Sequence, residues 1–255
     1  MRGMNKRSNS SGQERLIFAL DTGEDFQGAV ALVDLLKDHV GMFKVGKEVF
    51  TRFGPPIVSE IIARGGRIFL DLKFHDIPNT VAQAARAAVG MDVSMFNVHA
   101  LGGETMMAAT VESVRVRAGE LHVAPPLILA VTVLTSLDDS DLEGMGFRHG
   151  AAETAVHLAT LARTAGMSGV VASAQDVVPI RAACGEDFVI VTPGVRPGDS
   201  VAGDDQKRIL TPSQAIARGA DYLVVGRPIR LAKDPVAMAD RIGQDILEGL
   251  SMREG

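Results

Sequence analysis

The chain has 255 residues, of which 46% are hydrophobic but only 4% aromatic, and its formal net charge is −5 at pH 7. Few aromatic rings and a negative charge argue against a nucleic-acid partner, because such proteins rely on base stacking and positive charge. The single cysteine, Cys184, excludes an intrachain disulfide and a multi-cysteine metal site, and is consistent with a reducing compartment. No apolar run is long enough to span a membrane, so we expect a cytoplasmic protein without a membrane partner.

Residues 1–13 are polar and lack the apolar segment of a secretory signal. We expect a disordered tail there, followed by one domain over residues 14–255. In that domain short apolar runs alternate with stretches whose apolar residues recur every three or four positions, a pattern typical of alternating strands and helices. The clearest helical patterns cover residues 30–37, 57–64 and 81–89. The predicted strands cover residues 16–20, 42–45, 67–72, 94–98, 127–133, 169–172, 188–191 and 222–225.

Eight strands, each followed by a helix and with no break in composition, favour an α/β fold of the (β/α)8 TIM-barrel type. The alternative is a doubly wound open sheet, which would place a Gly-rich dinucleotide-binding turn after its first strand. The first predicted strand instead ends in Asp21-Thr22-Gly23-Glu24, which lacks that pattern. We therefore predict a single-domain barrel.

Polar residues stand at the ends of most predicted strands. A (β/α)8 barrel builds its active site from the loops at the carboxyl ends of its strands, so these residues predict one shared site. They are Asp21, Lys44, Asp71, Lys73, His99, Thr132, Thr135, Arg196 and Arg227. Among the chain's histidines no metal-ligand pattern is visible, and we expect His99 to be a hydrogen-bonded residue at a strand end.

The third predicted strand carries the most charge. Phe69, Asp71 and Lys73 alternate along it, so we expect their side chains to share one face. Asp76 follows in the next loop, and Pro78 can begin the next helix. A solvated strand end would explain any one of these charges, but buried charges are costly unless they are paired, so the whole set indicates a site.

The segments after the seventh and eighth strands predict a phosphate site. Gly194, Gly198 and Gly226 allow a ligand to approach the backbone, and Arg227 offers two parallel donors to phosphate oxygens. The polar segment 196–208 has no helix or strand pattern and is typical of a lid. The connection 135–150 predicts a loop with a capped helical turn, because its acidic residues lack calcium-loop spacing.

The segment Phe69-Leu70-Asp71-Leu72-Lys73-Phe74-His75-Asp76-Ile77-Pro78-Asn79-Thr80 resembles the signature of the orotidine 5′-phosphate decarboxylase family. Further segments resemble that family in the same order, so that the resemblance covers the chain after the tail. They are Ala19-Leu20-Asp21, Lys44-Val45-Gly46-Lys47-Glu48, Asn97-Val98-His99-Ala100, Val131-Thr132-Val133-Leu134-Thr135-Ser136, Thr192-Pro193-Gly194-Val195-Arg196-Pro197 and Val225-Gly226-Arg227-Pro228.

This resemblance implies a homodimeric barrel that uses neither cofactor nor metal and converts orotidine 5′-monophosphate into UMP and carbon dioxide in pyrimidine biosynthesis. The implied catalytic residues are Lys73, Asp71, Lys44 and Asp76. Lys73 would donate a proton to C6 of the pyrimidine, and Asp71 would lie beside the departing carboxylate. Lys44 would hold a ribose hydroxyl together with Asp21.

The resemblance also implies the other substrate contacts. Asp76 and Thr80 would reach the partner's site, and Ile77 lies in the same substrate-binding segment. Thr135 would contact the pyrimidine edge. The phosphate would be bound by Gln206, Gly226 and Arg227, with Arg196 supporting that loop.

Two other functions stay open. A magnesium-dependent sugar-phosphate decarboxylase or aldolase of a sister barrel would share Asp71, Lys73 and Asp76. It would also need a further acidic ligand, for which Glu48 is the only obvious candidate, although a glutamate there is also favoured by the helix dipole. A non-catalytic phosphosugar-binding barrel would not need Lys73 between two carboxylates.

Overall fold

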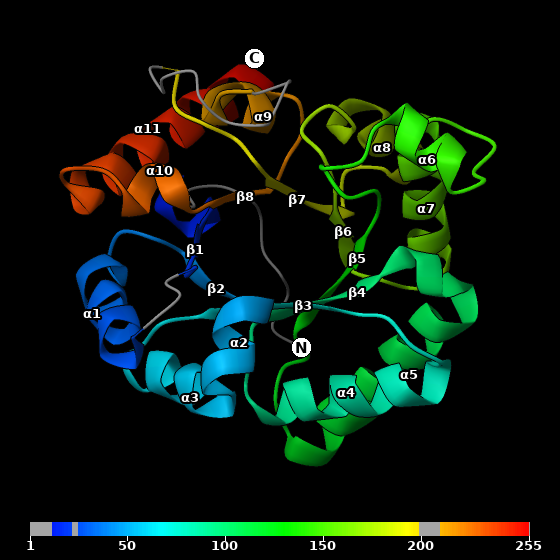
Figure 1. Ribbon diagram of the computed structural model, residues 1–255, viewed down its shortest axis with the longest axis horizontal. Helices are drawn as coiled ribbons and strands as arrows, with labels where there is room; N and C mark the ends of the chain where they lie inside the picture. The colour runs from blue at the N-terminus through cyan, green and yellow to red at the C-terminus, as the bar shows by residue number, and fades with distance from the viewer. Residues whose placement is uncertain (1–11, 22–24, 199–209, 255) are drawn as a thin grey trace.

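The computed structural model describes residues 12–21, 25–198 and 210–254. Eight parallel strands close into a barrel in chain order, with β8 paired to β1, and helices form a ring around it (Figure 1). The strands are β1 Leu16–Ala19, β2 Met42–Gly46, β3 Ile68–Phe74, β4 Met95–His99, β5 Leu127–Val131, β6 Gly169–Val171, β7 Val189–Pro193 and β8 Tyr222–Val225. The predicted (β/α)8 barrel is confirmed, and the ends of its strands differ from the predicted ends by no more than two residues.

The helices follow the strands as the sequence predicts. Two proline-led helices cover predicted segments, since Pro55 begins α3 and Pro78 begins α4, positions where proline loses no helical hydrogen bond. Asp138 caps α6 by accepting hydrogen bonds from the backbone N–H groups of Ser140 and Asp141, which confirms the capped turn in the long connection. The helices are α1 Phe26–Leu36, α2 Lys47–Phe53, α3 Pro55–Ala63, α4 Pro78–Gly90, α5 Gly103–Leu121, α6 Asp139–Gly144, α7 Ala151–Thr164, α8 Val177–Cys184, α9 Pro212–Ala217, α10 Arg227–Arg230 and α11 Pro235–Glu254, with 3-10 turns η1 Gly12–Arg15 and η2 Ala100–Gly102.

The core has two layers, because successive strand residues point to opposite faces of the sheet. Outward residues such as Phe18, Phe43 and Phe96 pack between the sheet and the helices. Inward residues such as Met42 and Phe69 fill the barrel. The barrel is therefore a packed core rather than a pore, and a site can form only at its ends.

The N-terminal boundary differs from the prediction. Gly12 and Gln13, which we expected in the tail, belong to η1, and Gly12 is buried. Gly12 packs so tightly on α11 that an added Cβ would lie 1.9 Å from the carbonyl oxygen of Gly243, and the Gln13 side chain donates to Asp240 Oδ1 at 3.1 Å. Gly12 and Gln13 therefore pack against the barrel, and residues 1–11, the rest of the predicted tail, lie outside the described part. In the part of the chain that the structure describes, no helix is long and apolar enough to cross a membrane.

Candidate active site

Four charged side chains alternate in sign at the C-terminal ends of β1, β2 and β3. Lys44 Nζ lies 3.2 Å from Asp21 Oδ1 and 3.4 Å from Asp71 Oδ2. Lys73 Nζ lies 2.6 Å from Asp71 Oδ1. Asp71 therefore contacts both lysines, one through each carboxylate oxygen. We call Asp21, Lys44, Asp71 and Lys73 the charge row.

The charge row runs from the surface into the barrel mouth. The side chain of Asp21 is 49% exposed, whereas those of Lys44 and Asp71 are 11% and 12% exposed. Lys73 is intermediate, with 26% of its side chain exposed. Below the row the barrel is apolar, so these charges act in a medium that screens them less than water does.

Strand register explains why the row forms. Ala19 pairs with Lys44 across β1 and β2, and Gly46 pairs with Asp71 across β2 and β3. Lys44 shares the inward face with Met42, as the sequence predicts. Residues far apart in the sequence thus meet at one edge of the barrel.

The third strand is less regular than we expected. Leu70 pairs with Phe96 and Phe74 pairs with Val98, so four steps along β3 match only two along β4. Within this bulge Lys73 has a left-handed backbone, with φ of +52°, which is uncommon for a residue with a Cβ. The predicted proximity of Asp71 and Lys73 is seen in their 2.6 Å contact, which forms across a bulge rather than along a regular strand.

Asn97 and Gly46 belong to the site, although sequence reasoning gave them no role. Asn97 is fully buried on β4, and it hydrogen-bonds both the side chain of Asp71 and the backbone of Lys73. Gly46 lies beneath the row, where an added Cβ would be 2.8 Å from Lys44 Nζ. A polar amide within the apolar run of the fourth strand was the available signal for Asn97, because a buried amide needs partners.

His99 differs from its prediction. Its Nδ1 is buried and has no hydrogen-bond partner among the described residues, so the expected hydrogen bond is wrong for this atom. The ring stacks on that of His75, with 5.3 Å between centroids. Burial, followed by the nearby charges of His75, Lys47 and Lys73, lowers the pKa of His99 to about 4. The imidazole is therefore neutral at physiological pH.

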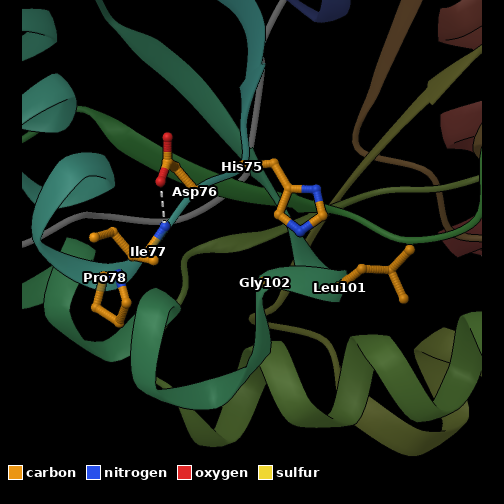
Figure 2. A pocket seen from close by; sticks show the side chains of 6 residues that line it. All are labelled: His75, Asp76, Ile77, Pro78, Leu101 and Gly102. Atoms are coloured by element: carbon orange, nitrogen blue, oxygen red, sulfur yellow. Dashed lines mark hydrogen bonds between the residues drawn. The ribbon is translucent and has the colours of Figure 1, made fainter.

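The residues that lead into α4 are exposed. Asp76 and Thr80 are exposed, and 66% of Ile77 is accessible to solvent. Within the described residues no ion pair joins Asp76 to Lys73, and Asp76 Oδ1 accepts a hydrogen bond from the Ile77 backbone at 2.6 Å. Figure 2 shows this bond in a shallow pocket that also contains Leu101 and His75.

The predicted phosphate residues lie across β1 from the lysines. Gly226 follows β8 at the N-terminus of α10, and an added Cβ there would lie 3.1 Å from the Ala19 side chain and 3.8 Å from Asp21 Oδ2. Arg227 is exposed beside it. The backbone N–H of Arg196 donates to the carbonyl of Leu210, which joins the two ends of a connection whose residues 199–209, including Gln206, lie outside the described part.

Two further predicted residues have clear positions. Thr135 is exposed in the turn after β5. Glu48 is exposed in the first turn of α2, a position where the helix dipole favours an acidic residue. Across residues 12–21, 25–198 and 210–254, no group of three or more His, Cys, Asp or Glu side chains is arranged to hold a metal ion.

Comparison with known proteins gives a consistent result. Residues 14–242 match the model of the orotidine 5′-phosphate decarboxylase / HUMPS family. An orotidine 5′-phosphate decarboxylase of Syntrophus aciditrophicus is 61% identical over 246 residues, which cover 96% of this chain and 98% of that protein. The same-named protein of Geobacter metallireducens is 50% identical, over 95% of this chain and all of its own length.

Solved structures agree with the sequence comparison. The crystal structure of orotidine 5′-phosphate decarboxylase from Lactobacillus acidophilus superposes with a TM-score of 0.79 at 36% identity, over 91% of this chain and 98% of the other. Family model, relatives and fold all span nearly the whole barrel. The chain belongs to the orotidine 5′-phosphate decarboxylase / HUMPS family.

Proposed function

We propose that this protein decarboxylates orotidine 5′-monophosphate to UMP and carbon dioxide, a step of pyrimidine biosynthesis. The charge row is the observation that supports this proposal most strongly, because it presents the Lys73 ammonium beside a buried carboxylate at the barrel mouth. Full-length relatives named orotidine 5′-phosphate decarboxylase add further support.

The reaction needs a cation near the reacting carbon. When the bond between C6 and the carboxylate carbon breaks, its electron pair stays on C6, where the ring offers little resonance relief. A fixed ammonium aimed at C6 stabilises that charge without having to reorganise. Lys73 then gives a proton to C6, carbon dioxide leaves, and solvent returns a proton to the amine. The charge row holds Lys73 in place through its contact with Asp71.

The remaining roles follow the layout of the barrel rim. Lys44 and Asp21 hold the ribose hydroxyls at the outer end of the charge row. Gly226 and Arg227, close to Asp21 across β1, bind the phosphate together with Gln206, while Arg196 supports the loop between them and Thr135 contacts the pyrimidine edge. Binding energy from the phosphate, which is remote from C6, helps to place the pyrimidine against Lys73.

A second subunit completes the site in this proposal. Asp76, Ile77 and Thr80 are exposed, so they are available to a partner. The shallow pocket around Ile77 and Leu101 offers apolar surface for that contact. We therefore assign Asp76 and Thr80 to the site of the partner in a homodimer.

A decarboxylation assay with a chelator tests the proposal. Purified protein that has been dialysed against EDTA is mixed with orotidine 5′-monophosphate, and UMP and carbon dioxide are quantified. We expect equal amounts of both products and no loss of rate in EDTA. If magnesium were required for turnover, a metal-dependent sister activity would be favoured, and if no UMP formed, the proposal would be wrong.

A further inference from the structure

Asn97 is a fully buried amide at the inward-facing side of β4. It stands between Met95, which fills the barrel interior, and His99 at the mouth, and its partner on β5 is the apolar Leu129. Burying an amide is unfavourable unless its donor and acceptor are both satisfied. The hydrogen-bond partners of Asn97 therefore indicate its role in the site.

Both partners belong to the bulge of β3. Asn97 Oδ1 accepts a hydrogen bond from the backbone N–H of Lys73 at 2.8 Å. Asn97 Nδ2 donates to Asp71 Oδ1 at 2.7 Å. The orientation of the amide follows from these partners, since the N–H needs an acceptor and the carboxylate needs a donor.

The two bonds act on different features of the charge row. The bond to Lys73 holds a backbone that is left-handed, a conformation that a residue with a Cβ adopts only when its surroundings impose it. The bond to Asp71 fixes the rotation of its carboxylate, so that Oδ1 faces Lys73 at 2.6 Å and Oδ2 faces Lys44 at 3.4 Å. One amide thus sets both halves of the Asp71–Lys73 pair.

We infer that Asn97 is a positioning residue for decarboxylation: it aims the Lys73 ammonium by holding the β3 bulge and the Asp71 carboxylate together. This inference rests on the proposed function. Asn97 acts through Asp71 and Lys73 and has no assigned contact with substrate. Because Asn97 contacts Asp71 and Lys73 rather than the residues proposed to bind ribose and phosphate, its loss should affect turnover more than binding.

Two substitutions separate positioning from folding. Asn97→Ala removes both hydrogen bonds. Asn97→Asp keeps the size of the side chain and the acceptor for Lys73, but an ionised carboxylate there repels Asp71. When the carboxyl of Asn97→Asp is protonated, its O–H can donate to Asp71 in place of the lost amide N–H. Thr110→Val is the matched control, because Thr110 is also fully buried and hydrogen-bonded, but to Met106 within α5.

The pH profile of Asn97→Asp is the decisive readout. The charged or titratable groups around this position are Asp71 and Lys73 from β3, Lys44 from β2, Asp21 after β1, His99 from β4 and His75 from the loop after β3, whereas β5 presents apolar residues. Burial and Asp71 favour the neutral acid at residue 97, so its proton should be lost at a higher pH than usual.

We expect the kcat of Asn97→Ala to fall about 100-fold at every pH, the scale of a 1 Å misplacement of a reacting group. Asn97→Asp should lose as much at pH 8 and recover at least about tenfold toward pH 5.5, relative to wild type at each pH. The dissociation constant for UMP should stay within about threefold for both, since the loss lies in the transition state.

Three results would overturn the inference while wild-type enzyme is active. They are a kcat for both variants within about threefold of Thr110→Val, a loss in Asn97→Asp that does not change with pH, and a loss confined to UMP affinity. If Asn97→Ala fails to fold, the pH profile of kcat for the isosteric variant Asn97→Asp tests the inference by itself. Inactive wild-type protein would instead contradict the proposed decarboxylation itself.

Discussion

Gly46 leaves the space in which the Lys44 ammonium lies. A methyl group added at Gly46 would be 2.8 Å from Lys44 Nζ and 3.5 Å from Asp21 Oδ1. The end of a lysine moves easily, so Gly46→Ala should shift this ammonium without disturbing the strand. We expect kcat/KM to fall by about tenfold to 100-fold, as for other misplaced contact groups, while the thermal unfolding temperature changes little.

Gly119→Ala is the control for that substitution. Gly119 lies inside α5 with no atom within 4 Å of an added Cβ, so alanine there should keep full activity and stabilise the helix slightly. Steady-state kinetics and thermal unfolding of both variants check this. If Gly46→Ala kept the kcat/KM of wild type, Lys44 would not need its present position.

Asp176 gives the protein a stability that depends on pH. This residue precedes α8 and is only 8% exposed, and burial raises the pKa of its carboxyl from 3.8 to about 6. Between those values the folded state keeps a proton that the unfolded chain releases, so the free energy of unfolding falls as pH rises from about 4 to about 6.

Asp176→Asn should remove this loss. We expect the variant to be more stable than wild type by up to about 3 kcal/mol at pH 8, with the difference vanishing toward pH 4. Denaturant unfolding across that range measures it, with the exposed Asp187→Asn as control. A difference that stays constant with pH would show that the carboxyl of Asp176 is not perturbed.

At the scale of single residues, the sequence predicted the charged side chains of the site but not the residues that hold these side chains in position. Asp71 and Lys73 could be predicted as site residues because charged side chains that are partly buried at a strand end are costly unless they are paired. The roles of Asn97 and Gly46 depend on register between strands and on a bulge, and the only local signal of either was the polar amide within the apolar fourth strand. The lowered pKa of His99, and its buried Nδ1 without a hydrogen-bond partner among the described residues, were unpredictable for the same reason.

Among the elements, the N-terminal ends of β7 and β8 are held by a buried ion pair. Asp221 Oδ2 accepts hydrogen bonds from Arg181 Nη2 at 2.8 Å and from the Ile190 backbone at 2.9 Å. The second terminal nitrogen of Arg181, Nη1, donates to backbone carbonyls just after α8, including that of Phe188 at 2.6 Å. Both side chains are almost fully buried, at the barrel end opposite the charge row. This end of a barrel serves stability rather than catalysis.

Asp221→Asn should therefore separate stability from activity. We expect unfolding to become easier by about 3–5 kcal/mol, because Arg181 would keep a buried and uncompensated charge. The kcat/KM of the folded fraction should not change. Removing the exposed pair of Arg115 and Glu112 is the control and should have no measurable effect. If denaturant unfolding of Asp221→Asn matched wild type, the ion pair would not be structural.

For the whole molecule, the fold was predictable because one pattern repeats eight times. Strands rich in Val, Ile and Leu alternate with helices over the full domain, and in each repeat the residues favour the secondary structure that they adopt. The proposed association of two subunits has no such repeat. It is argued from Asp76, Ile77 and Thr80, which are exposed.

Subunit mixing tests the shared site. Dimers of Lys73→Ala and of Asp76→Ala should each be inactive, but a hybrid dimer contains one site with both residues intact. With complete exchange of equal amounts, about a quarter of all sites are intact, so about a quarter of wild-type activity should appear. Mixing Lys73→Ala with Lys44→Ala is the control and should restore none, because both residues serve the same subunit. Proven exchange without recovery would contradict the shared site.

The most direct test of the whole account compares binding and turnover in Lys73→Ala. We expect this variant to bind UMP nearly as well as wild type, because ribose and phosphate contacts remain. Its release of carbon dioxide from orotidine 5′-monophosphate should fall by about 100-fold to 1000-fold, the scale for removing a group aimed at developing charge. Lys37→Ala, which changes an exposed lysine at the far end of α1, should behave as wild type. Turnover by Lys73→Ala at the wild-type rate would contradict the account.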